Sequence, residues 1–243
     1  MKKRKSQAIS SARGAKDPVG QAIRLFWKHS QQESYEAAEA ANYLIDVQAD
    51  KLDDDVIPVK HLFRDFDSMP LLEQKALELT QGKTLDIGAA AGCHSLYLQA
   101  KGIDVTPIDI SPGAVDVMKE RGLNAQFADI FKYKVDVKFN TVLALMNGLG
   151  IAGTEAQLPQ YLQALKSLLA DGGQILIDSS DLGEFAEDFS EIRYQMHFKN
   201  SKSKIFPWLF LTYERFEAVA LEQGFKVEQV YADKDGSYLV KLS

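Results

Sequence analysis

The sequence of 243 residues predicts an α/β fold built on a doubly wound, mostly parallel sheet. Between Thr84 and Asp109 the chain passes from a short apolar strand through a glycine turn into a helix, and then into a second apolar strand. Further strand-like and helix-like segments alternate up to Asp178 and are joined by short glycine links. This alternation is typical of parallel strands with right-handed crossovers.

The turn after the first strand predicts a nucleotide site. It reads Asp-Ile-Gly-Ala-Ala-Ala-Gly from Asp86 to Gly92 and lacks the G-x-G-x-x-G fingerprint of pyrophosphate-binding loops. An acidic residue at the strand end disfavours a phosphate but suits an ammonium group. Asp109 ends the second strand, where ligands of such sheets bind, and its carboxylate can accept hydrogen bonds from two ribose hydroxyls. We therefore expect a ligand with an amino-acid end and a ribose.

These residues resemble the class I S-adenosylmethionine-dependent methyltransferases, whose loop reads D/E-x-G-x-G-x-G. Here Ala90 replaces the middle glycine, and its methyl would crowd the cofactor unless the loop has relaxed around it. The resemblance implies a Rossmann-like fold and S-adenosyl-L-methionine as cofactor. It also implies the cofactor-binding residues, which are Asp86, Gly88, Ala89, Ala90, Gly92, His94, Asp109, Ile110, Asp129, Ile130 and Asn147.

The resemblance assigns roles to some of these residues. Asp129 would receive the adenine amino group, Ile130 would pack on the ring, and Asn147 would lie near the transferred methyl. His94 would contact the cofactor carboxylate or line the substrate pocket, or else serve packing alone. A Phe-Arg pair at 63–64 and a Met-Pro pair at 69–70 resemble a subgroup of small bacterial methyltransferases.

The segments before the first strand predict helices. Residues 1–16 hold six basic and no acidic residues and are expected to form a disordered basic arm. Asp17-Pro18 begins an amphipathic helix, and an alanine-rich helix is expected from Glu33 to about Asp50. Together residues 17–56 would form a helical cap over the ligand edge. A further helix is expected over 71–79, at the start of a methyltransferase domain that spans 57–243.

The segments after Asp109 complete the expected fold. Helices should begin at Ser111-Pro112 and near Thr154, and strands are expected at 125–128, 141–146 and 174–178. Beyond Asp178 the pattern becomes antiparallel: 191–198 alternates as a strand and 205–211 returns beside it, so 185–211 form an inserted hairpin or lid after the fifth strand. A helix over 213–224 and a C-terminal antiparallel hairpin of 226–231 and 237–242 follow.

Substrate binding is expected between the cap and the inserted hairpin, because the cofactor would use most side chains at the sheet edge. The candidate residues are Phe63, Arg64 and Met69 on one side and Arg193, Tyr194 and His197 on the other. Two arginines favour an acceptor with a carboxylate or phosphate, although a surface salt bridge is the alternative for Arg64. No catalytic residue is identified, since methyl transfer from a sulfonium needs mainly positioning.

The composition narrows the class of protein. The net charge of −6 and the missing Asn-Pro-Pro-Tyr signature disfavour nucleic acid, so we expect a small-molecule acceptor methylated on oxygen or nitrogen. The single Cys93 and four scattered histidines predict no disulfide and no metal site. The absence of an apolar span or secretion signal predicts a cytoplasmic protein without a membrane. Two alternative functions stay open, a nicotinamide oxidoreductase and a non-catalytic cofactor-binding protein. A homodimer is also possible from the sequence.

Overall fold

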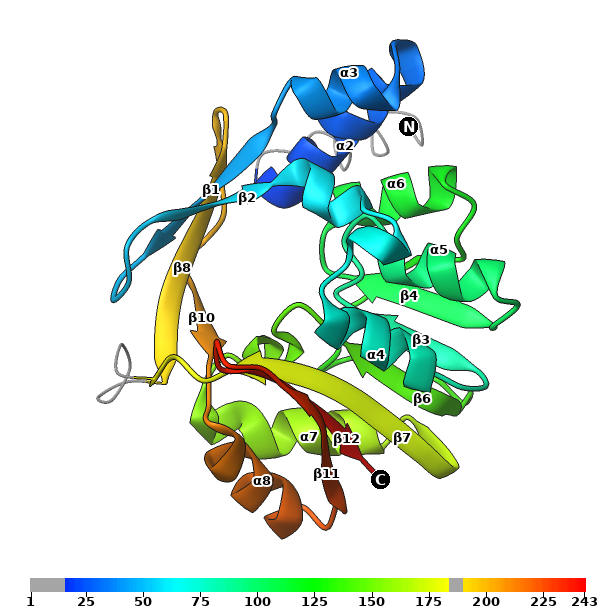
Figure 1. Cartoon of the computed structure of the whole chain (residues 1–243), viewed down its shortest axis with the longest axis vertical. Helices are drawn as coiled ribbons and strands as arrows, with labels where there is room; N and C mark the ends of the chain where they lie inside the picture. The colour runs from blue at the N-terminus through cyan, green and yellow to red at the C-terminus, as the bar shows by residue number, and fades with distance from the viewer. Residues whose placement is uncertain (1–15, 184–189) are drawn as a thin grey trace, which may run out of the picture.

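The computed structural model describes residues 16–183 and 190–243 and folds them into two sheets with flanking helices (Figure 1). The basic arm expected over 1–16 lies outside the described residues, apart from Lys16, and so does the segment 184–189, which includes the start of the inserted hairpin expected over 185–211.

The main sheet has seven strands in the order β11-β12-β7-β6-β3-β4-β5. Its five parallel strands are β3 (Thr84–Ile87), β4 (Val105–Asp109), β5 (Gln126–Phe127), β6 (Phe139–Ala144) and β7 (Leu169–Ser180). The C-terminal hairpin of β11 (Val227–Ala232) and β12 (Ser237–Leu242) joins β7 in antiparallel register. The predicted α/β class with a mostly parallel sheet is confirmed.

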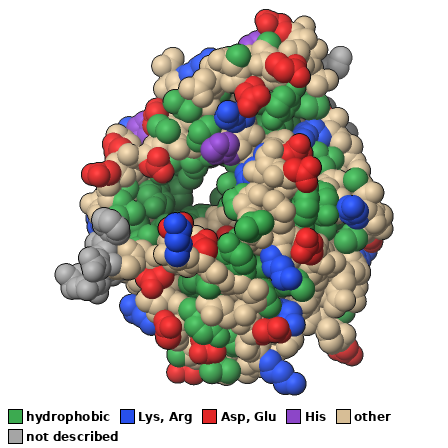
Figure 2. Space-filling view, in the orientation of Figure 1, with side chains coloured by type: hydrophobic (Ala, Val, Ile, Leu, Met, Phe, Trp, Pro, Cys, Tyr) green, Lys and Arg blue, Asp and Glu red, His purple; other side chains and the backbone are tan. Residues whose placement is uncertain are grey.

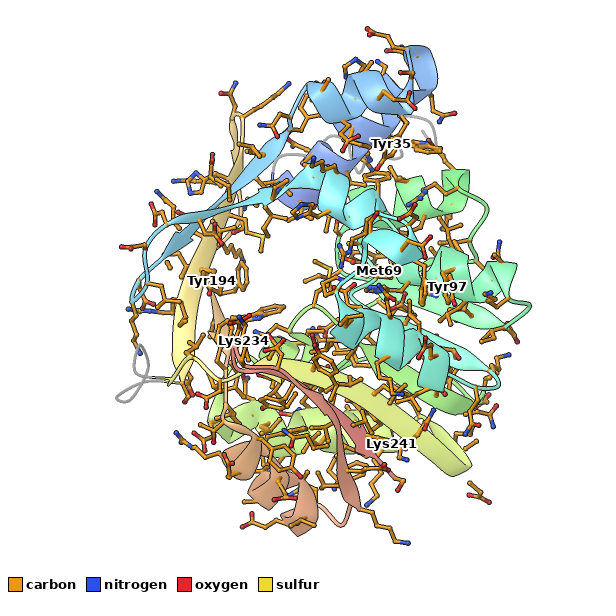
Figure 3. The ribbon with its side chains drawn as sticks, viewed as in Figure 1. Tyr35, Met69, Tyr97, Tyr194, Lys234 and Lys241 are labelled. Atoms are coloured by element: carbon orange, nitrogen blue, oxygen red, sulfur yellow. The ribbon has the colours of Figure 1, made fainter. Side chains whose placement is uncertain are left out.

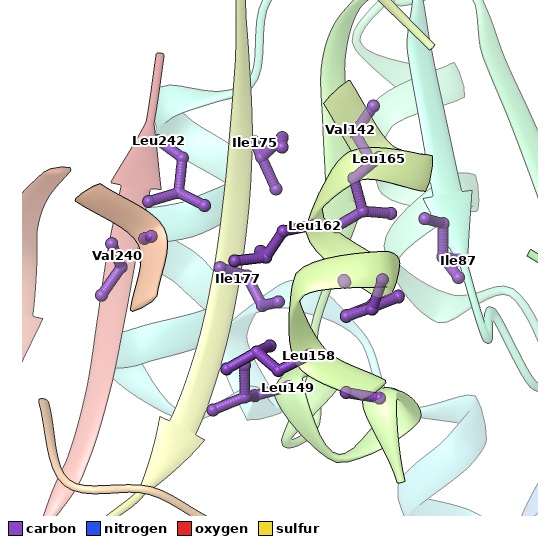
Figure 4. Close-up of a cluster of buried hydrophobic side chains, with 14 of the residues drawn as sticks. Ile87, Val142, Leu149, Leu158, Leu162, Leu165, Ile175, Ile177, Val240 and Leu242 are labelled. Atoms are coloured by element: carbon purple, nitrogen blue, oxygen red, sulfur yellow. The ribbon is translucent and has the colours of Figure 1, made fainter. Parts of the chain in front are cut away.

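Helices cover both faces of this sheet. On one face, α7 (Leu158–Lys166) packs Leu158, Leu162 and Leu165 against Ile175 and Ile177 (Figure 4). On the other face, α4 (Leu71–Leu79) and α5 (Cys93–Ala100) cover the alternate residues of the central strands, Leu143, Leu176 and Leu239. The central strands are therefore buried on both faces, which is why they read as continuous apolar runs. α6 (Pro112–Glu120) and α8 (Tyr213–Glu222) complete the layers.

A second sheet forms beside the carboxyl edge of the first and is antiparallel throughout, in the order β10-β8-β1-β2. The inserted hairpin supplies β8 (Glu191–Phe198) and β10 (Phe206–Leu209), as predicted, together with the short β9 (Ser201–Lys202). The other two strands, β1 (Leu44–Ala49) and β2 (Asp55–Pro58), come from the N-terminal segment.

The expectation of one helix from Glu33 to about Asp50 is wrong. The helix there is α3 (Tyr35–Ala40), and residues 44–49 form β1. Ile45 and Val47 are buried while Asp46 and Gln48 are exposed, which is the period of a half-buried strand. The partner that makes this strand favourable is β8, about 150 residues later in the chain, so a local reading of helix propensity could not find it.

The N-terminal helix α2 (Pro18–Gln32) is fixed to α6 by several contacts, among them one shared carboxylate, the ion pair of Arg24 with Asp116 and one close approach of the two backbones. Asp17 accepts hydrogen bonds from the Gly20 amide at 2.8 Å and the Gly113 amide at 3.0 Å, so it caps both helices. A Cβ added to Gly113 would lie 2.5 Å from the Gly20 Cα, which shows how closely the two backbones approach. Short 3₁₀ turns at η1 (Val59–Phe63), η2 (Phe66–Ser68), η3 (Gly148–Ala152) and η4 (Glu155–Gln157) connect the layers.

Candidate active site

The glycine loop follows β3 and is held by backbone contacts to β4. Its residues Gly88, Ala90 and Gly92 all have positive φ, at 69°, 50° and 82°. A Cβ on Gly92 would lie 2.5 Å from Leu123 Cδ1, whereas one on Gly88 would meet only Ile151 Cδ1, at 3.6 Å. Gly92 is thus required by packing as well as conformation, while the loop leaves an open surface at Gly88, beside the strand end.

Ala90 keeps the left-handed conformation although it carries a side chain. Its amide donates to Asp109 Oδ2 at 2.9 Å, and its methyl packs against the buried cluster that contains Phe63 and Ala91. An L-residue in this conformation costs roughly 1–2 kcal/mol. The loop has therefore accommodated alanine through contacts with the N-terminal segment.

The end of β4 offers a carboxylate and an apolar side chain. Asp109 accepts from the amides of Ala90 and Ser111, the latter at 2.7 Å, and burial raises the pKa of its carboxyl to about 6. Each carboxylate oxygen keeps a second lone pair for another donor. The next side chain, Ile110, is 71% exposed and can pack against a flat ligand.

The two residues expected to hold the adenine lie in different surroundings. Asp129 accepts from the Phe131 amide at 3.1 Å and from Lys132 Nζ at 2.9 Å, and it remains partly exposed. Ile130 is buried within the core cluster under α7. Of the two, Asp129 is the one whose side chain reaches the surface in this structure.

A buried ionic group ties α4 to the glycine-loop helix α5. Glu73 lies between Arg64 and His94, with Arg64 Nη2 at 2.5 Å from Oε1 and His94 Nε2 at 2.6 Å from Oε2. Burial opposes a charged His94, but Cys93, the hydrogen bond to Glu73 and the charge of Asp86 together raise the pKa of His94 well above its usual value. Asp86 accepts a hydrogen bond from the Ser95 hydroxyl at 2.6 Å.

Arg64 is thus engaged in a salt bridge, but a buried one. The side chains of Arg64 and Glu73 are only 10% and 6% exposed. Arg64 Nε is buried without a hydrogen-bond partner among the described residues. No pattern in the sequence marks Glu73 as a site residue, because a glutamate in the first turn of a helix is common. Its partners come from other elements.

The end of β6 is strained and carries unpartnered polar atoms. Met146 and Asn147 are consecutive residues with positive φ, at 64° and 62°. The amides of Asn147 and Gly148 donate to the carboxylate of Asp178 at 3.0 and 2.8 Å. Asn147 Oδ1 and Nδ2 are buried and have no partner among the described residues. Such strain and such orphaned atoms are typical of a ligand site.

Asp178 holds this strained turn and was not predicted as a site residue. Its position at the end of the fifth strand was a signal that the sequence did offer. Burial raises the pKa of Asp178 to about 6. A cavity of about 170 Å³ lies beside it, lined also by Glu73, Tyr231 and Asp233.

The predicted substrate residues do not share one surface. Strand alternation puts Tyr194 on one face of β8 and Arg193 and His197 on the other. Arg193 is exposed, and its Nε lies 2.7 Å from Asp50 Oδ2. Phe63 and Met69 are buried in hydrophobic clusters.

An opening lies between the two sheets, as the space-filling view shows (Figure 2). Tyr194 and Met69 lie on opposite sides of it, and Lys234 lies near its rim (Figure 3). The structure thus brings Tyr194, but not Arg193 or His197, to the space that faces the main sheet. Within residues 16–183 and 190–243, no cluster of three or more side chains could hold a metal ion, and no helix is long and apolar enough to cross a membrane.

Comparison with known proteins decides the family. The family described as "Methyltransferase domain" matches residues 84–173. The chain is 39% identical to an S-adenosylmethionine-dependent methyltransferase from Bacteroides fragilis, whose crystal structure is a complex with S-adenosyl-L-homocysteine. That match covers 94% of this chain and 95% of the other, with a TM-score of 0.85. The chain belongs to the class I S-adenosylmethionine-dependent methyltransferases.

Other methyltransferases share the fold at lower identity. An amino pentose methyltransferase from Micromonospora echinaspora is 16% identical, with 75% of this chain and 94% of that chain covered and a TM-score of 0.53. A sugar N-methyltransferase from Streptoalloteichus is 17% identical, with 78% and 94% covered and a TM-score of 0.55. At such identities the likeness concerns the fold alone. No match is found among the curated proteins.

The site of this methyltransferase fits its cofactor, S-adenosyl-L-methionine. The loop leaves open space at Gly88, Asp109 has lone pairs to spare, and Ile110 presents an apolar surface. The buried and unpartnered amide group of Asn147 calls for a polar partner at the same edge. Such a donor set suits a ligand that combines a ribose, a flat base and a polar tail.

Proposed function

We propose that this methyltransferase acts on an oxygen or nitrogen atom of a small molecule bound between the two sheets. The observation that supports this proposal is the opening between the two sheets, into which Tyr194 points and near whose rim Lys234 lies (Figures 2 and 3). The second sheet closes one side of the site, so the acceptor enters an enclosed space instead of lying on an open surface. Methyltransferases of the same fold that act on an amino pentose and on a sugar are in line with a small acceptor.

The residues of the chain would act mainly by positioning. When bound, S-adenosyl-L-methionine supplies a methyl group that is already activated by its sulfonium. Asp109 would accept hydrogen bonds from the ribose, Ile110 would pack on the base and Asp129 would receive its amino group. Asn147 would bind a polar group near the transferred methyl. Holding donor and acceptor in line, away from water, accounts for most of the expected rate enhancement.

Asp178 is a positioning residue in this proposal. Both of its oxygens accept backbone hydrogen bonds, from Asn147 and Gly148, and these bonds stabilise the strained turn that presents the Asn147 side chain. A neutral amine acceptor can lose its proton after methyl transfer and needs no general base for the attack; for an oxygen acceptor we assign no base.

An anionic acceptor stays a prediction. Arg64 and Arg193, which motivated it, are paired with Glu73 and Asp50, so an acceptor carboxylate would have to compete with these partners. Lys234 near the rim of the opening is a further cation on this side of it (Figure 3).

The test measures release of S-adenosylhomocysteine while the protein is incubated with S-adenosylmethionine and a set of small alcohols, phenols, amines and amino sugars. We expect turnover with one chemical group of this set, and loss of turnover in Asp109→Ala. Turnover only with a protein or nucleic-acid acceptor would contradict the proposal. Tight binding of NAD in place of S-adenosylhomocysteine would favour an oxidoreductase. Cofactor binding without turnover of any acceptor would favour a non-catalytic role.

A further inference from the structure

The inner face of the second sheet is apolar and rich in aromatic residues. Strand register places Tyr194 beside Phe206, Ile192 beside Trp208, and Met196 beside Val47, so all of these share one face. Figure 3 shows Tyr194 pointing from this face into the opening. The charged and polar residues of the same strands, Asp46, Gln48, Arg193 and His197, occupy the other face.

The two ends of this inner face are anchored, and its middle is not. At one end, Ile45 and Phe198 are buried in the cluster that contains Phe26 and Phe63. At the other end, the Trp208 ring lies so close to Gly150 that a Cβ there would be 2.0 Å from Trp208 Nε1. Between these ends the aromatic side chains are only partly buried, and Tyr194 is the one that points into the opening (Figure 3).

Three side chains of this face and Phe210, which directly follows β10, form one connected wall, which we call the aromatic wall: Tyr194, Phe206, Trp208 and Phe210. The ring centroids of Tyr194 lie 6.4 Å from Phe206 and 6.5 Å from Phe210, and those of Phe206 and Trp208 are 6.1 Å apart. The planes are tilted or edge-on, which leaves ring edges and faces available for another aromatic group.

The aromatic wall is also close to the expected reaction centre. Trp208 rests on Gly150 in η3, and η3 directly follows Asn147. A molecule lying against the wall would therefore lie near the unpartnered side chain of Asn147. The wall itself carries no charge and only one hydroxyl group, which suits a flat apolar ring better than a sugar with several hydroxyl groups.

We propose that the aromatic wall binds an aromatic ring of the acceptor, so that the substrate is a small aromatic molecule methylated on a hydroxyl or amino substituent. This inference rests on the proposed function and deepens it. Edge-to-face and offset stacking distinguish an aromatic ring from a saturated ring of the same size. The substituent that receives the methyl would reach from the ring toward Asn147.

The experiment compares 2-phenylethanol with 2-cyclohexylethanol and methyl glucoside as probes. Their binding to the full chain saturated with S-adenosylhomocysteine is measured by saturation-transfer NMR. We expect 2-phenylethanol to bind at least fivefold more tightly than either other probe. Tyr194→Leu and Phe206→Leu should each weaken its binding at least fivefold while the affinity for S-adenosylhomocysteine stays the same. Gln48→Ala, on the outer face of the same sheet, is the matched control and should bind as the wild type does.

A second measurement does not depend on altering the wall. The chain has two tryptophans, Trp27 and Trp208, so Trp27→Phe leaves Trp208 as the single reporter. Its emission should shift with 2-phenylethanol and not with 2-cyclohexylethanol. Equal binding of the two alcohols, a preference for methyl glucoside, or an unchanged Trp208 signal would overturn the aromatic acceptor. Failure to bind S-adenosylhomocysteine would instead overturn the proposed function.

Discussion

Ala90 shows how one residue can satisfy packing while it strains the backbone. Its φ of 50° is a conformation that glycine adopts freely, yet its methyl packs against the cluster around Phe63. The replacement of the family glycine is therefore compensated by the N-terminal segment. In a chain without that segment, no packing of the methyl would offset the backbone strain of alanine at this position.

Ala90→Gly should raise the free energy of unfolding by about 0.5 kcal/mol. Glycine relieves the left-handed strain, which is worth roughly 1 kcal/mol. The methyl that is lost contributes at most ~0.8 kcal/mol, and less here because it is only partly buried. Urea denaturation measures the change, and calorimetry should show the same affinity for S-adenosylhomocysteine. A loss of stability would mean that methyl packing dominates, and tighter binding would mean that the methyl crowds the cofactor.

Cofactor affinity should depend on pH through Asp109. Burial raises the pKa of this carboxyl to about 6, so it becomes protonated as the pH falls below 6 and loses its capacity to accept two ribose hydroxyls. Affinity for S-adenosylhomocysteine should thus rise between pH 5 and 7 and then level off. Calorimetry across this range is the measurement, with Asp109→Asn as the control that should flatten the profile. Asp109→Ala should weaken binding by roughly 1.5–3 kcal/mol at pH 7.5, and equal affinity would remove Asp109 from the site.

At the scale of elements, the buried group of Arg64, Glu73 and His94 connects η1, α4 and α5. Burial opposes ionisation of Glu73, but His94 and Arg64 together hold the pKa of its carboxyl below the usual value. The three side chains are mutually dependent, because removing the central carboxylate leaves two cations close together and away from water.

Glu73→Gln should therefore destabilise the fold by roughly 3–5 kcal/mol, as expected when one partner of a buried ion pair is removed. Thermal or urea unfolding measures the loss. Asp50→Asn removes the exposed partner of Arg193 and serves as the contrast, with a much smaller effect because solvent screens that pair. Similar losses in the two variants would show that burial of the Glu73 group contributes little.

The elements that the sequence predicted well are those with local patterns. β3, β4, β6 and the helices between them could be located from apolar runs, caps and glycine links, because each unit carries its own signal. β1 could not, since its partner β8 is distant in the sequence. The site shows the same division: the glycine loop and Asp109 follow a motif, whereas Glu73 and Asp178 gain their roles only from tertiary contacts.

At the scale of the whole molecule, the N-terminal segment contacts both the main sheet's helices and the second sheet. Its helix α2 is fixed to α6, and its strand β1 lies between β2 and β8. Deletion of residues 1–50 would therefore remove an internal strand as well as a helix. We therefore expect this deletion to cause a large loss of stability.

A single substitution tests the attachment of α2 more cleanly. Gly113→Ala places a methyl 2.5 Å from the Gly20 backbone, so α2 and α6 must separate or shift. We expect a loss of roughly 1–3 kcal/mol, typical of an overpacked contact, together with faster proteolysis within residues 17–50. Thermal unfolding and limited proteolysis are the measurements, and Lys119→Ala, at an exposed position of α6, is the control. Unchanged proteolysis would show that α2 is held by other contacts.

The pairing of β1 with β8 also sets an order of events during synthesis. β1 leaves the ribosome early, but its partner follows about 150 residues later, after the strands of the cofactor site. Until then β1 exposes an unpaired edge, which favours association with other chains. The half that binds the cofactor can thus form before the aromatic wall exists.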